Sequence, residues 1–365
     1  MSETATGVLD LSPRGEGFLR HAARSFAPTG DDVFVAPEIV RQFGLCAGAT
    51  VTGPAQKGKR GLRLAGVDAV CGLAPGAWRA RPAFNDLTAM NPDRRFDLGR
   101  DGDPSLRIVD LVAPVGRGTR GLIVAPPKTG KTMLLEAMAK AIAADAPEAR
   151  IVVLLIDERP EEVTHFRRAV PAEVLASSSD QDVKAHVRLA EMALAQARCE
   201  LECGHDVVLL VDSLTRMGRA FNAASAGTGR TLSGGVDSRA LEIPRRFFGM
   251  ARNVENGGSI TVIATALIET GSRMDDVIFE EFKGTGNMEL VLSRQLAERR
   301  IFPAFDLRAS GTRRDDLMYA EDEMDALNLL RRRAAAALPG PAMEGMLELM
   351  RRYPDNAALL AGIRG

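Results

Sequence analysis

The sequence has few aromatic side chains. Its 365 residues include 14 Phe, two Tyr and one Trp, so aromatic residues make up 5% of the chain. A protein that captures single-stranded nucleic acid by stacking bases therefore has few ring faces to offer. No stretch reaches the roughly 18 consecutive apolar residues of a membrane-spanning helix, and the start, MSETATGVLDLSPRGEG, has neither a basic nor an apolar segment. We expect a cytoplasmic protein without a membrane partner.

Cysteine is also scarce, with four residues, Cys46, Cys71, Cys199 and Cys203, which excludes a disulfide scaffold. Cys199 and Cys203 lie near His205 and leave two interpretations, a metal site or two ordinary helical cysteines. The second is favoured because metal sites normally bring four ligands at tight spacing. The 47 basic and 48 acidic side chains give a net charge of −1, and this balance gives no overall sign of a polyanionic partner.

Residues 1–75 alternate short apolar runs with turn residues. The runs VLDL, FLRHA and VFVAP are separated by PRGEG and PTGDD, and TVTGP and LRLAGV follow a short helical stretch. Strands at this spacing predict a small β-barrel. Residues 76–105 contain Pro82, Pro92 and Pro104 among Arg and Asp, and we expect them to form a linker.

Continuous apolar runs characterise residues 106–320. GLIVAP (121–126), IVVLLID (151–157), DVVLLVD (206–212) and SITVIATAL (259–267) alternate with helical patterns. Runs rich in Val and Ile without polar alternation predict strands buried on both faces, as in a parallel sheet covered by helices. Residues 321–365 have a helical pattern. The expected fold class is therefore α/β: a mostly parallel-sheet domain, preceded by a small β-barrel and followed by a helical C-terminal segment.

A phosphate-binding loop is indicated by the segment APPKTGKT, residues 125–132, between a predicted strand and a predicted helix. Backbone N–H groups at such a helix start can surround phosphates, and the helix dipole favours their charge. Lys131 is then expected to reach the β- and γ-phosphates of ATP, and the Thr132 hydroxyl to bind Mg²⁺. Ala125 replaces the usual first glycine. Lys128 is either a solvated loop cation or a second phosphate contact.

Two carboxylates end the neighbouring apolar runs. Asp212 closes VVLLVD, which suits a Mg²⁺-binding acid, with an N-cap of the next helix as the alternative. Glu158 follows IVVLLID and is the candidate general base that polarises an attacking water. Asp157 is the alternative base, and both acids with Arg159 are also compatible with a charge cluster at a helix start.

Several of these strings closely resemble the Rho family of transcription termination factors. They include GLIVAPPKTGKTMLL, LIDERPEEVT, EEFKGTGNMEL and SGTR, and the similarity extends from about Leu106 to Met318, more loosely back to Gly7. The resemblance implies RecA-like P-loop ATPase domains in a homohexameric ring, each carrying an OB/cold-shock-like RNA-binding barrel. It also implies that ATP hydrolysis drives helicase-like translocation on single-stranded RNA and releases RNA from the RNA polymerase transcription complex.

The resemblance also carries site residues onto matching positions. It implies Glu158 as base, Asp212 as the acid on Mg²⁺, and Arg313 as an arginine finger for the neighbouring subunit's ATP. Without the resemblance, Arg313 is one charge in a basic run. The residues implied to bind nucleotide are Lys128, Thr129, Gly130, Lys131, Thr132, Met133, Arg159 and Phe302, with Phe302 against the adenine.

Two loops, 226–235 and 283–287, are implied to face RNA in the ring, although Gly-rich polar loops are often only connectors. Their expected contacts are Arg230, Thr231, Ser233, Lys283 and Gly284. In the barrel, the expected contacts are Phe18, Arg20 and Phe34, unless the two rings belong to the barrel core.

The barrel departs from the family at Glu16, where an aromatic residue is usual, and a carboxylate there cannot stack on a base. Two further hypotheses therefore stay open. One is a paralogue with an intact motor but altered RNA loading and a regulatory or RNA-remodelling role. The other is a non-motor scaffold, DNA recombinase or rotary-ATPase subunit, which the catalytic set and the family strings disfavour.

Overall fold

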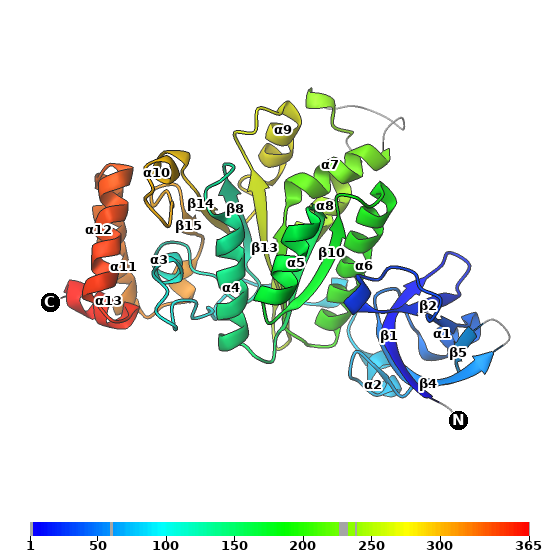
Figure 1. The fold of residues 1–365 in the computed structure, drawn as a ribbon. Coiled ribbons are helices and arrows are strands. Elements are labelled where there is room, and N and C mark those ends of the chain that lie inside the picture. Colours follow the sequence, from blue (N-terminus) through cyan, green and yellow to red (C-terminus); the bar gives the residue numbers. More distant parts are fainter. Residues whose placement is uncertain (1–2, 59–60, 226–232, 238, 365) are drawn as a thin grey trace.

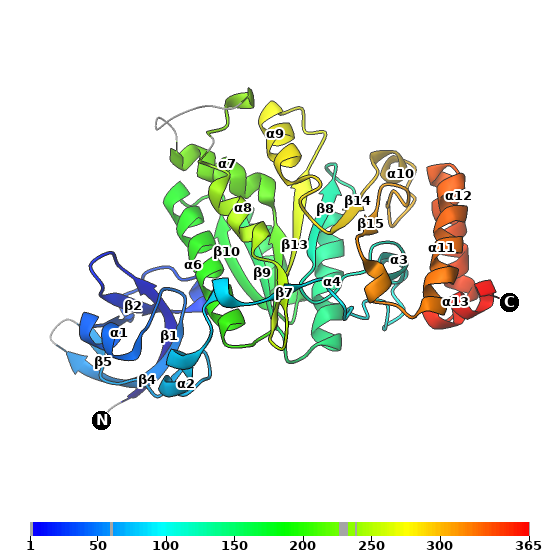
Figure 2. The ribbon, with the colours of Figure 1, turned by 180° about the vertical axis from the view of Figure 1, so that it is seen from behind.

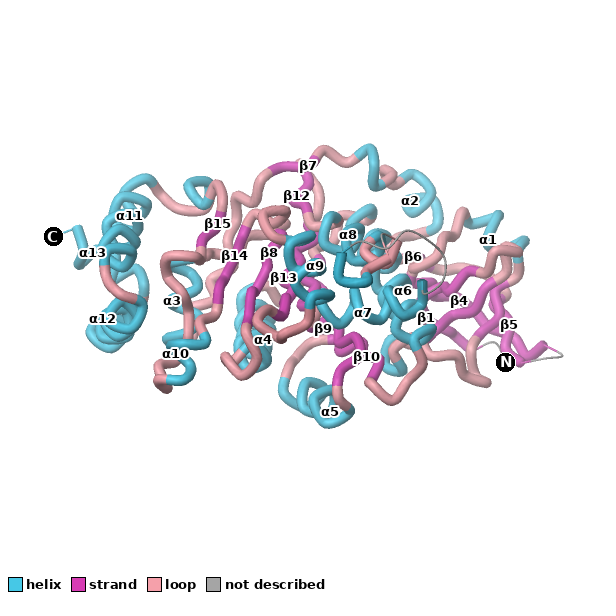
Figure 3. The backbone as a smooth tube through the Cα atoms, turned by 90° about the horizontal axis from the view of Figure 1, so that it is seen from above, coloured by secondary structure: helices cyan, strands magenta, loops and turns pink. Residues whose placement is uncertain are grey.

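The chain forms a small N-terminal β-barrel, a central sheet covered by helices, and a group of C-terminal helices (Figure 1). The computed structural model describes residues 3–58, 61–225, 233–237 and 239–364. Seen from above, the barrel and the C-terminal helices lie at opposite ends of the central sheet (Figure 3). No helix in these ranges is long and apolar enough to cross a membrane.

The barrel closes because β1 pairs with both β2 and β4. Alternate residues of β4, such as Val51 and Ala55, point inward and are buried, as expected for strands with one face on a core. This confirms the predicted barrel. Its elements are β1 (Glu3–Leu11), β2 (Gly17–Arg20), η1 (Ala22–Arg24), β3 (Val33–Val35), α1 (Pro37–Phe43), β4 (Thr50–Gly58), β5 (Gly61–Leu64) and β6 (Ala69–Val70).

The segment expected to be a linker packs against both neighbouring domains. It contains α2 (Pro75–Ala80), η2 (Phe84–Asp86) and β7 (Ala89–Met90), and β7 pairs with β12 (Arg252–Val254) of the central sheet. Trp78 is buried and donates a hydrogen bond to the Gly44 carbonyl at 3.1 Å. Figure 2 shows the segment crossing from the barrel past β7 to α3 (Pro104–Val112). The connection is therefore held by packing.

The central sheet has parallel strands in the order β10-β9-β11-β13-β8-β14, and β15 is antiparallel at its edge. This confirms the predicted parallel sheet. The four apolar runs correspond to β8, β9, β11 and β13, whereas β10 and β14 were not singled out from the sequence. The bounds are β8 (Arg120–Ala125), β9 (Arg150–Glu158), β10 (Glu173–Ser178), β11 (Val207–Asp212), β13 (Ser259–Leu267), β14 (Met288–Val291) and β15 (Gly311–Thr312).

Helices cover both faces of this sheet, which explains why its strands lack polar alternation. Ile123 and Val153 belong to the core with α4 and α5, whereas Leu122 and Val152 belong to the core with α6, α7 and α8. The helices and 3₁₀ turns are α4 (Lys131–Asp145), α5 (Pro160–Ala169), α6 (Val183–Glu202), α7 (Leu214–Ser225), η3 (Ser233–Gly235), α8 (Glu242–Gly249), α9 (Arg273–Phe282), α10 (Arg294–Glu298) and η4 (Asp315–Leu317).

The C-terminal segment is helical, as predicted, and consists of α11 (Glu321–Ala336), α12 (Pro339–Arg352) and α13 (Asn356–Arg364). It packs on α3, where the buried Arg107 donates hydrogen bonds to the carbonyls of Met350 and Tyr353, each at 2.9 Å. A buried guanidinium needs such acceptors, and the two carbonyls therefore tie these helices to the central domain.

The four cysteines meet where the barrel packs on α6. The Sγ atoms of Cys46 and Cys199 lie 3.6 Å apart, and Cys71 and Cys203 belong to the same packed cluster. All four are free thiols. Within the described ranges, no group of three or more His, Cys, Asp or Glu residues is placed to hold a metal ion. These cysteines pack in the domain interface.

Candidate functional site

The predicted phosphate-binding loop joins β8 to the first turn of α4, as its spacing requires. Lys128 and Gly130 have φ angles of 66° and 96°, and the Thr129 hydroxyl donates to the Pro126 carbonyl at 2.7 Å. The loop is therefore bent so that α4 begins at Lys131. The free N–H groups of this helix start lie at the carboxyl edge of the sheet, where open α/β sheets bind their ligands. Ala125 is fully buried as the last residue of β8.

Asp212 lies at the same edge and has no exposed surface. The Lys131 ammonium forms an ion pair with Oδ1 of Asp212, and the Thr265 hydroxyl donates to the same oxygen at 3.0 Å. Oδ2 of Asp212 is buried without a hydrogen-bond partner among the described residues. A buried carboxylate oxygen of this kind fits a Mg²⁺ ligand. Helix α7 is capped instead by Ser213, whose hydroxyl oxygen accepts from the Arg216 N–H at 3.1 Å.

Glu158 ends β9 and is only 1% exposed. Its Oε1 accepts hydrogen bonds from Nη2 of Arg216 at 3.0 Å and from the Arg159 N–H at 3.1 Å. Burial, with the nearby Asp212 carboxylate, raises the pKa of Glu158. Asp157 is more exposed, and its carbonyl accepts from Nη1 of Arg216 at 2.7 Å. Of the two adjacent acids, Glu158 is the one whose carboxylate is buried beside Asp212.

Two exposed apolar side chains flank the same edge. Met133, in the first turn of α4, is 76% exposed, and Phe302, after α10, is 46% exposed. The loop that carries Phe302 is tied to the edge, because the Ser293 N–H donates to the Ala304 carbonyl at 2.7 Å and the Leu292 N–H to the Val124 carbonyl at 2.8 Å. Exposed apolar surface beside a phosphate-binding loop suits the flat face of a nucleotide base.

Arg313 is not near the phosphate-binding loop of its own chain. It follows β15, whose Thr312 pairs with Met288 at the start of β14, level with Gly121 at the start of β8. At about 3.3 Å per residue, roughly 13 Å of strand separates that level from the end of β8. The exposed guanidinium of Arg313 instead donates to the Gly284 carbonyl at 3.1 Å.

The second predicted RNA loop therefore adjoins Arg313. Gly284 has a φ of 72°, and the Lys283 ammonium forms an ion pair with Glu280 at 3.2 Å. In the first loop, Arg230 and Thr231 lie outside the described residues. Ser233 is the first residue of η3, and the structure describes its backbone only.

Phe18 and Phe34 form an aromatic pair on the barrel surface. They face each other across β2 and β3, with ring centroids 5.6 Å apart in an edge-to-face arrangement, and Phe18 is 38% exposed. Arg20 lies 5.0 Å from the Phe18 centroid, but its guanidinium is buried in ion pairs with Asp10, at 3.0 Å, and Asp32. The two rings are thus available to a ligand, and Arg20 is already paired beside them.

The sequence pattern missed Thr265 and Ser213. Thr265 contributes a hydroxyl from within the apolar run SITVIATAL, and Ser213 caps α7 directly after Asp212. The signal for Thr265 was a hydroxyl group in a mostly apolar strand, because a buried hydroxyl needs a hydrogen-bond partner.

A phosphate-binding loop with buried acids at the carboxyl edge of a parallel sheet, joined to a barrel with exposed rings, defines an ATPase with an attached nucleic-acid-binding domain. Residues 105–312 match the ATP synthase alpha/beta family, nucleotide-binding domain, and residues 5–76 match the Rho termination factor, RNA-binding domain. The chain belongs to the Rho family of transcription termination factors, as an ATP-hydrolysing, RNA-binding member.

Curated relatives cover nearly the whole chain. The transcription termination factor Rho of Haemophilus influenzae is 50% identical over 357 residues, covering 96% of this chain and 85% of that protein. The Rho of Streptomyces coelicolor is 50% identical over 364 residues, covering 100% and 86%. The Rho of Streptomyces lividans is 49% identical over 365 residues, and the chain spans about half of its length, 51%.

Solved structures show the same fold at low identity. The assembled ATPase EscN of the enteropathogenic E. coli type III secretion system is 22% identical with a TM-score of 0.61, covering 78% of this chain and 74% of that one. A prototypical ATPase from the type III secretion system of pathogenic bacteria is 21% identical with a TM-score of 0.62, covering 76% and 88%. These likenesses concern the fold alone.

Proposed function

We propose that the chain is the subunit of a cytoplasmic homohexameric RNA translocase that terminates transcription by releasing RNA from RNA polymerase. The observation that carries this proposal is the buried group of Lys131, Asp212 and Glu158 on a chain that also presents the aromatic pair Phe18 and Phe34. An ATPase site and an RNA-binding barrel in one subunit allow hydrolysis to be coupled to movement along a strand.

In this proposal the nucleotide is held by the loop and its flanks. Lys128, Thr129, Gly130 and the first turn of α4 bind the phosphates, with Lys131 on the β- and γ-phosphates. Phe302 and Met133 cover the adenine, and Arg159 contacts the nucleotide from the start of α5. The exposure of Phe302 and Met133 supports this assignment, because both side chains are open to a ligand.

Thr132 and Asp212 would hold Mg²⁺, which neutralises phosphate charge during transfer when it is bound. The unpartnered Oδ2 of Asp212 supports this assignment. Glu158 acts as the base that orients and deprotonates the attacking water. Its raised pKa supports that role, because a base with an elevated pKa accepts a proton more readily.

Arg313 completes the site of the neighbouring subunit. Its position at the opposite edge of its own sheet from the phosphate-binding loop supports a role in trans. Hydrolysis then depends on the assembled ring. The loops containing Arg230, Thr231, Ser233, Lys283 and Gly284 contact RNA in the ring's channel, and the contact of Arg313 with Gly284 links this RNA loop to the finger.

ATPase activity measured beside native mass tests this proposal. We expect hydrolysis to rise steeply with single-stranded, cytidine-rich RNA, to respond little to duplex DNA, and to follow the hexamer as the protein is diluted. Equal hydrolysis with and without RNA would contradict the proposal.

Glu16 favours a second candidate, a paralogue with the same motor but weakened RNA loading and a regulatory or remodelling role. Glu16 lies between β1 and β2, directly before the strand that carries Phe18. Its charge repels phosphate where a ring is usual in the family. RNA release from stalled transcription complexes separates the two candidates, because a remodelling paralogue hydrolyses ATP on RNA without releasing the transcript.

A further inference from the structure

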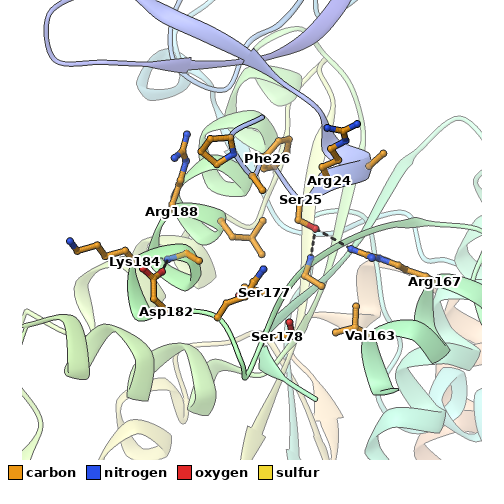
Figure 4. A pocket seen from close by; sticks show the side chains of 17 residues that line it. Arg24, Ser25, Phe26, Val163, Arg167, Ser177, Ser178, Asp182, Lys184 and Arg188 are labelled. Carbon is orange, nitrogen blue, oxygen red and sulfur yellow. Dashed lines mark hydrogen bonds between the residues drawn. The ribbon is translucent and has the colours of Figure 1, made fainter. Parts of the chain in front are cut away.

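A cavity of about 570 Å³ lies between the barrel and the central domain (Figure 4). Residues 23–28, between β2 and β3, form one side, and α5, β10 and the start of α6 form the other. Phe26 is fully buried and belongs to the core of the central domain. The Ser25 hydroxyl accepts from the Ala176 N–H at 2.9 Å. These contacts hold the two sides of the cavity in place.

The cavity lining is strongly basic. Its charged residues are Arg24, Arg167, Lys184, Arg188 and Asp182. Figure 4 shows Arg188 and Lys184 on one side of the cavity and Arg24 and Arg167 on the other. Asp182 is the one acid in this lining. Its Oδ1 accepts a hydrogen bond from the Ala185 N–H at 2.8 Å, so the side chain is held in place as the N-cap of α6.

Among the residues that the structure describes, Arg24, Arg167 and Lys184 form no ion pair shorter than 4.0 Å. Arg24 is 4.0 Å from Asp31 and both side chains are largely exposed, so this pair contributes little. Arg167 contacts the Ser25 hydroxyl at 3.4 Å. Lys184 is exposed and has no ion-pair partner in the part of the chain that the structure describes. These positive charges therefore remain available to a polyanion.

The cavity adjoins the strand pair that carries Phe18, because Asp10 of β1 lies opposite Phe18 of β2. The fourth cation, Arg188, forms an ion pair with Asp10, and Asp10 also pairs with Arg20, which lies 5.0 Å from the Phe18 ring. Barrels of this type engage about 4–16 nucleotides along a basic groove, which is more than two rings can stack. A strand whose bases meet Phe18 and Phe34 thus needs further backbone contacts, and the basic cavity lies just beyond the Asp10–Arg188 ion pair.

We propose that this cavity binds the phosphate backbone of single-stranded RNA next to the bases held by Phe18 and Phe34. The inference rests on the proposed function, since it requires that the barrel binds RNA. Arg24, Arg167 and Lys184 contact phosphates and carry no base specificity. These phosphate contacts compensate for the RNA affinity that is lost where Glu16 stands in place of a stacking ring.

Binding of two labelled cytidine oligomers, a dinucleotide and a twelve-nucleotide strand, tests the proposal with the full chain. The variant combines Arg24→Gln, Arg167→Gln and Lys184→Gln, and leaves the Asp10–Arg188 ion pair intact. We expect unchanged affinity for the dinucleotide and about tenfold or greater loss for the longer strand at low salt. The slope of log K against log salt should fall by up to about 2, because each phosphate contact contributes about 0.7.

Arg41→Gln is the matched control, since Arg41 is an exposed barrel cation outside the cavity lining. If the triple variant melts at a lower temperature than the wild type, Lys184→Glu alone is the second variant.

Unchanged binding of both oligomers overturns the proposal. Equal losses for both overturn it too, because the cavity then only positions the barrel. Competition by millimolar inorganic phosphate without any length effect assigns the cavity to free phosphate instead. A wild-type chain that binds neither oligomer refutes the proposed function rather than this site.

Discussion

The carboxyl edge of the sheet, here called the nucleotide edge, consists of buried and paired charges, whereas the outer face of the barrel presents exposed aromatic rings. At the nucleotide edge, Asp212 and Glu158 are buried, and each is held by a cation and further hydrogen bonds. On the barrel, Phe18 and Phe34 are partly exposed rings that offer contact area to a ligand. Buried charges without partners are costly, whereas an exposed ring can be replaced without unfolding the chain. Substitutions in the ATPase site are therefore limited by their cost to folding stability, whereas the exposed residues that capture RNA can be replaced without that cost.

Glu16 illustrates that freedom. The carboxylate lies in the domain that matches the Rho RNA-binding domain, whereas the lysine, acids and arginine expected at the ATPase site are all present in the chain. We therefore expect changes at the nucleotide edge to affect turnover by orders of magnitude, and changes on the barrel to affect RNA affinity more modestly and leave the motor intact.

The largest effect is expected for Arg313→Ala, which should lower RNA-stimulated ATPase activity by about 10³–10⁵-fold if Arg313 acts as the proposed arginine finger. The variant should still form hexamers by native mass. Arg314→Ala is the control, because Arg314 is adjacent but paired with Asp316. Mixed rings of wild-type and Arg313→Ala subunits should lose activity in proportion to the interfaces affected. Full activity of Arg313→Ala rings would remove the residue from the mechanism.

Glu158→Gln should lower kcat by about 10²–10⁴-fold, the usual contribution of a general base, with little change in ATP affinity. The substitution keeps the size of the side chain. Single-turnover hydrolysis and nucleotide binding measure the two quantities separately. If Asp157→Asn has the larger effect on kcat, the base has been assigned to the wrong neighbour.

Lys131→Ala should lower hydrolysis by about 10²–10³-fold, comparable to the loss of one charge-stabilising donor, and leave RNA binding by the barrel unchanged. Lys140→Ala is the control on the same helix, since Lys140 is exposed and forms an ion pair with Glu136 one turn earlier in α4. Thermal melting must accompany the assay, because Lys131 is the ion-pair partner of the buried Asp212. A chain that keeps its cellular function with this substitution acts as a scaffold.

Glu16→Tyr tests RNA capture by the barrel. One added stacking ring is worth about 1–3 kcal/mol, so affinity for short pyrimidine oligomers should rise by roughly 5- to 150-fold, with ATPase activity at saturating RNA unchanged. Glu38→Tyr, at an exposed site on α1, controls for a general effect of replacing an acid by an aromatic residue. Equal affinity of the Glu16 variant and wild type would show that RNA is captured elsewhere.

The smallest effect concerns pH. The base acts when deprotonated, and burial with Asp212 raises the pKa of Glu158, so kcat should fall on the acidic side at a higher pH than for an ordinary glutamate. Arg216 opposes this shift because its positive charge favours the carboxylate. Arg216→Gln should therefore move the acidic limb of the pH–rate profile further upward. A limb that stays in place would mean that another group controls it.

Local sequence determined much of this protein. The buried apolar runs predicted the parallel strands, and the spacing APPKTGKT predicted the loop between β8 and α4 because a strand, a tight turn and a helix start are short-range features. Asp212 and Glu158 were identifiable because each ends an apolar run. Together with the family strings, these features identified the ATPase and the RNA-binding barrel, whereas the individual residue roles stay predictions.

Only the tertiary structure decided which distant residues meet. Strand order brings Lys131 and Thr265 to Asp212 and puts Arg313 at the opposite edge. Docking of the barrel gathers all four cysteines at one interface and assembles a basic cavity from 23–28, α5 and α6. A chain with a net charge of −1 can hold such a cavity because folding sorts charges by position, and a sum over the sequence carries no positional information.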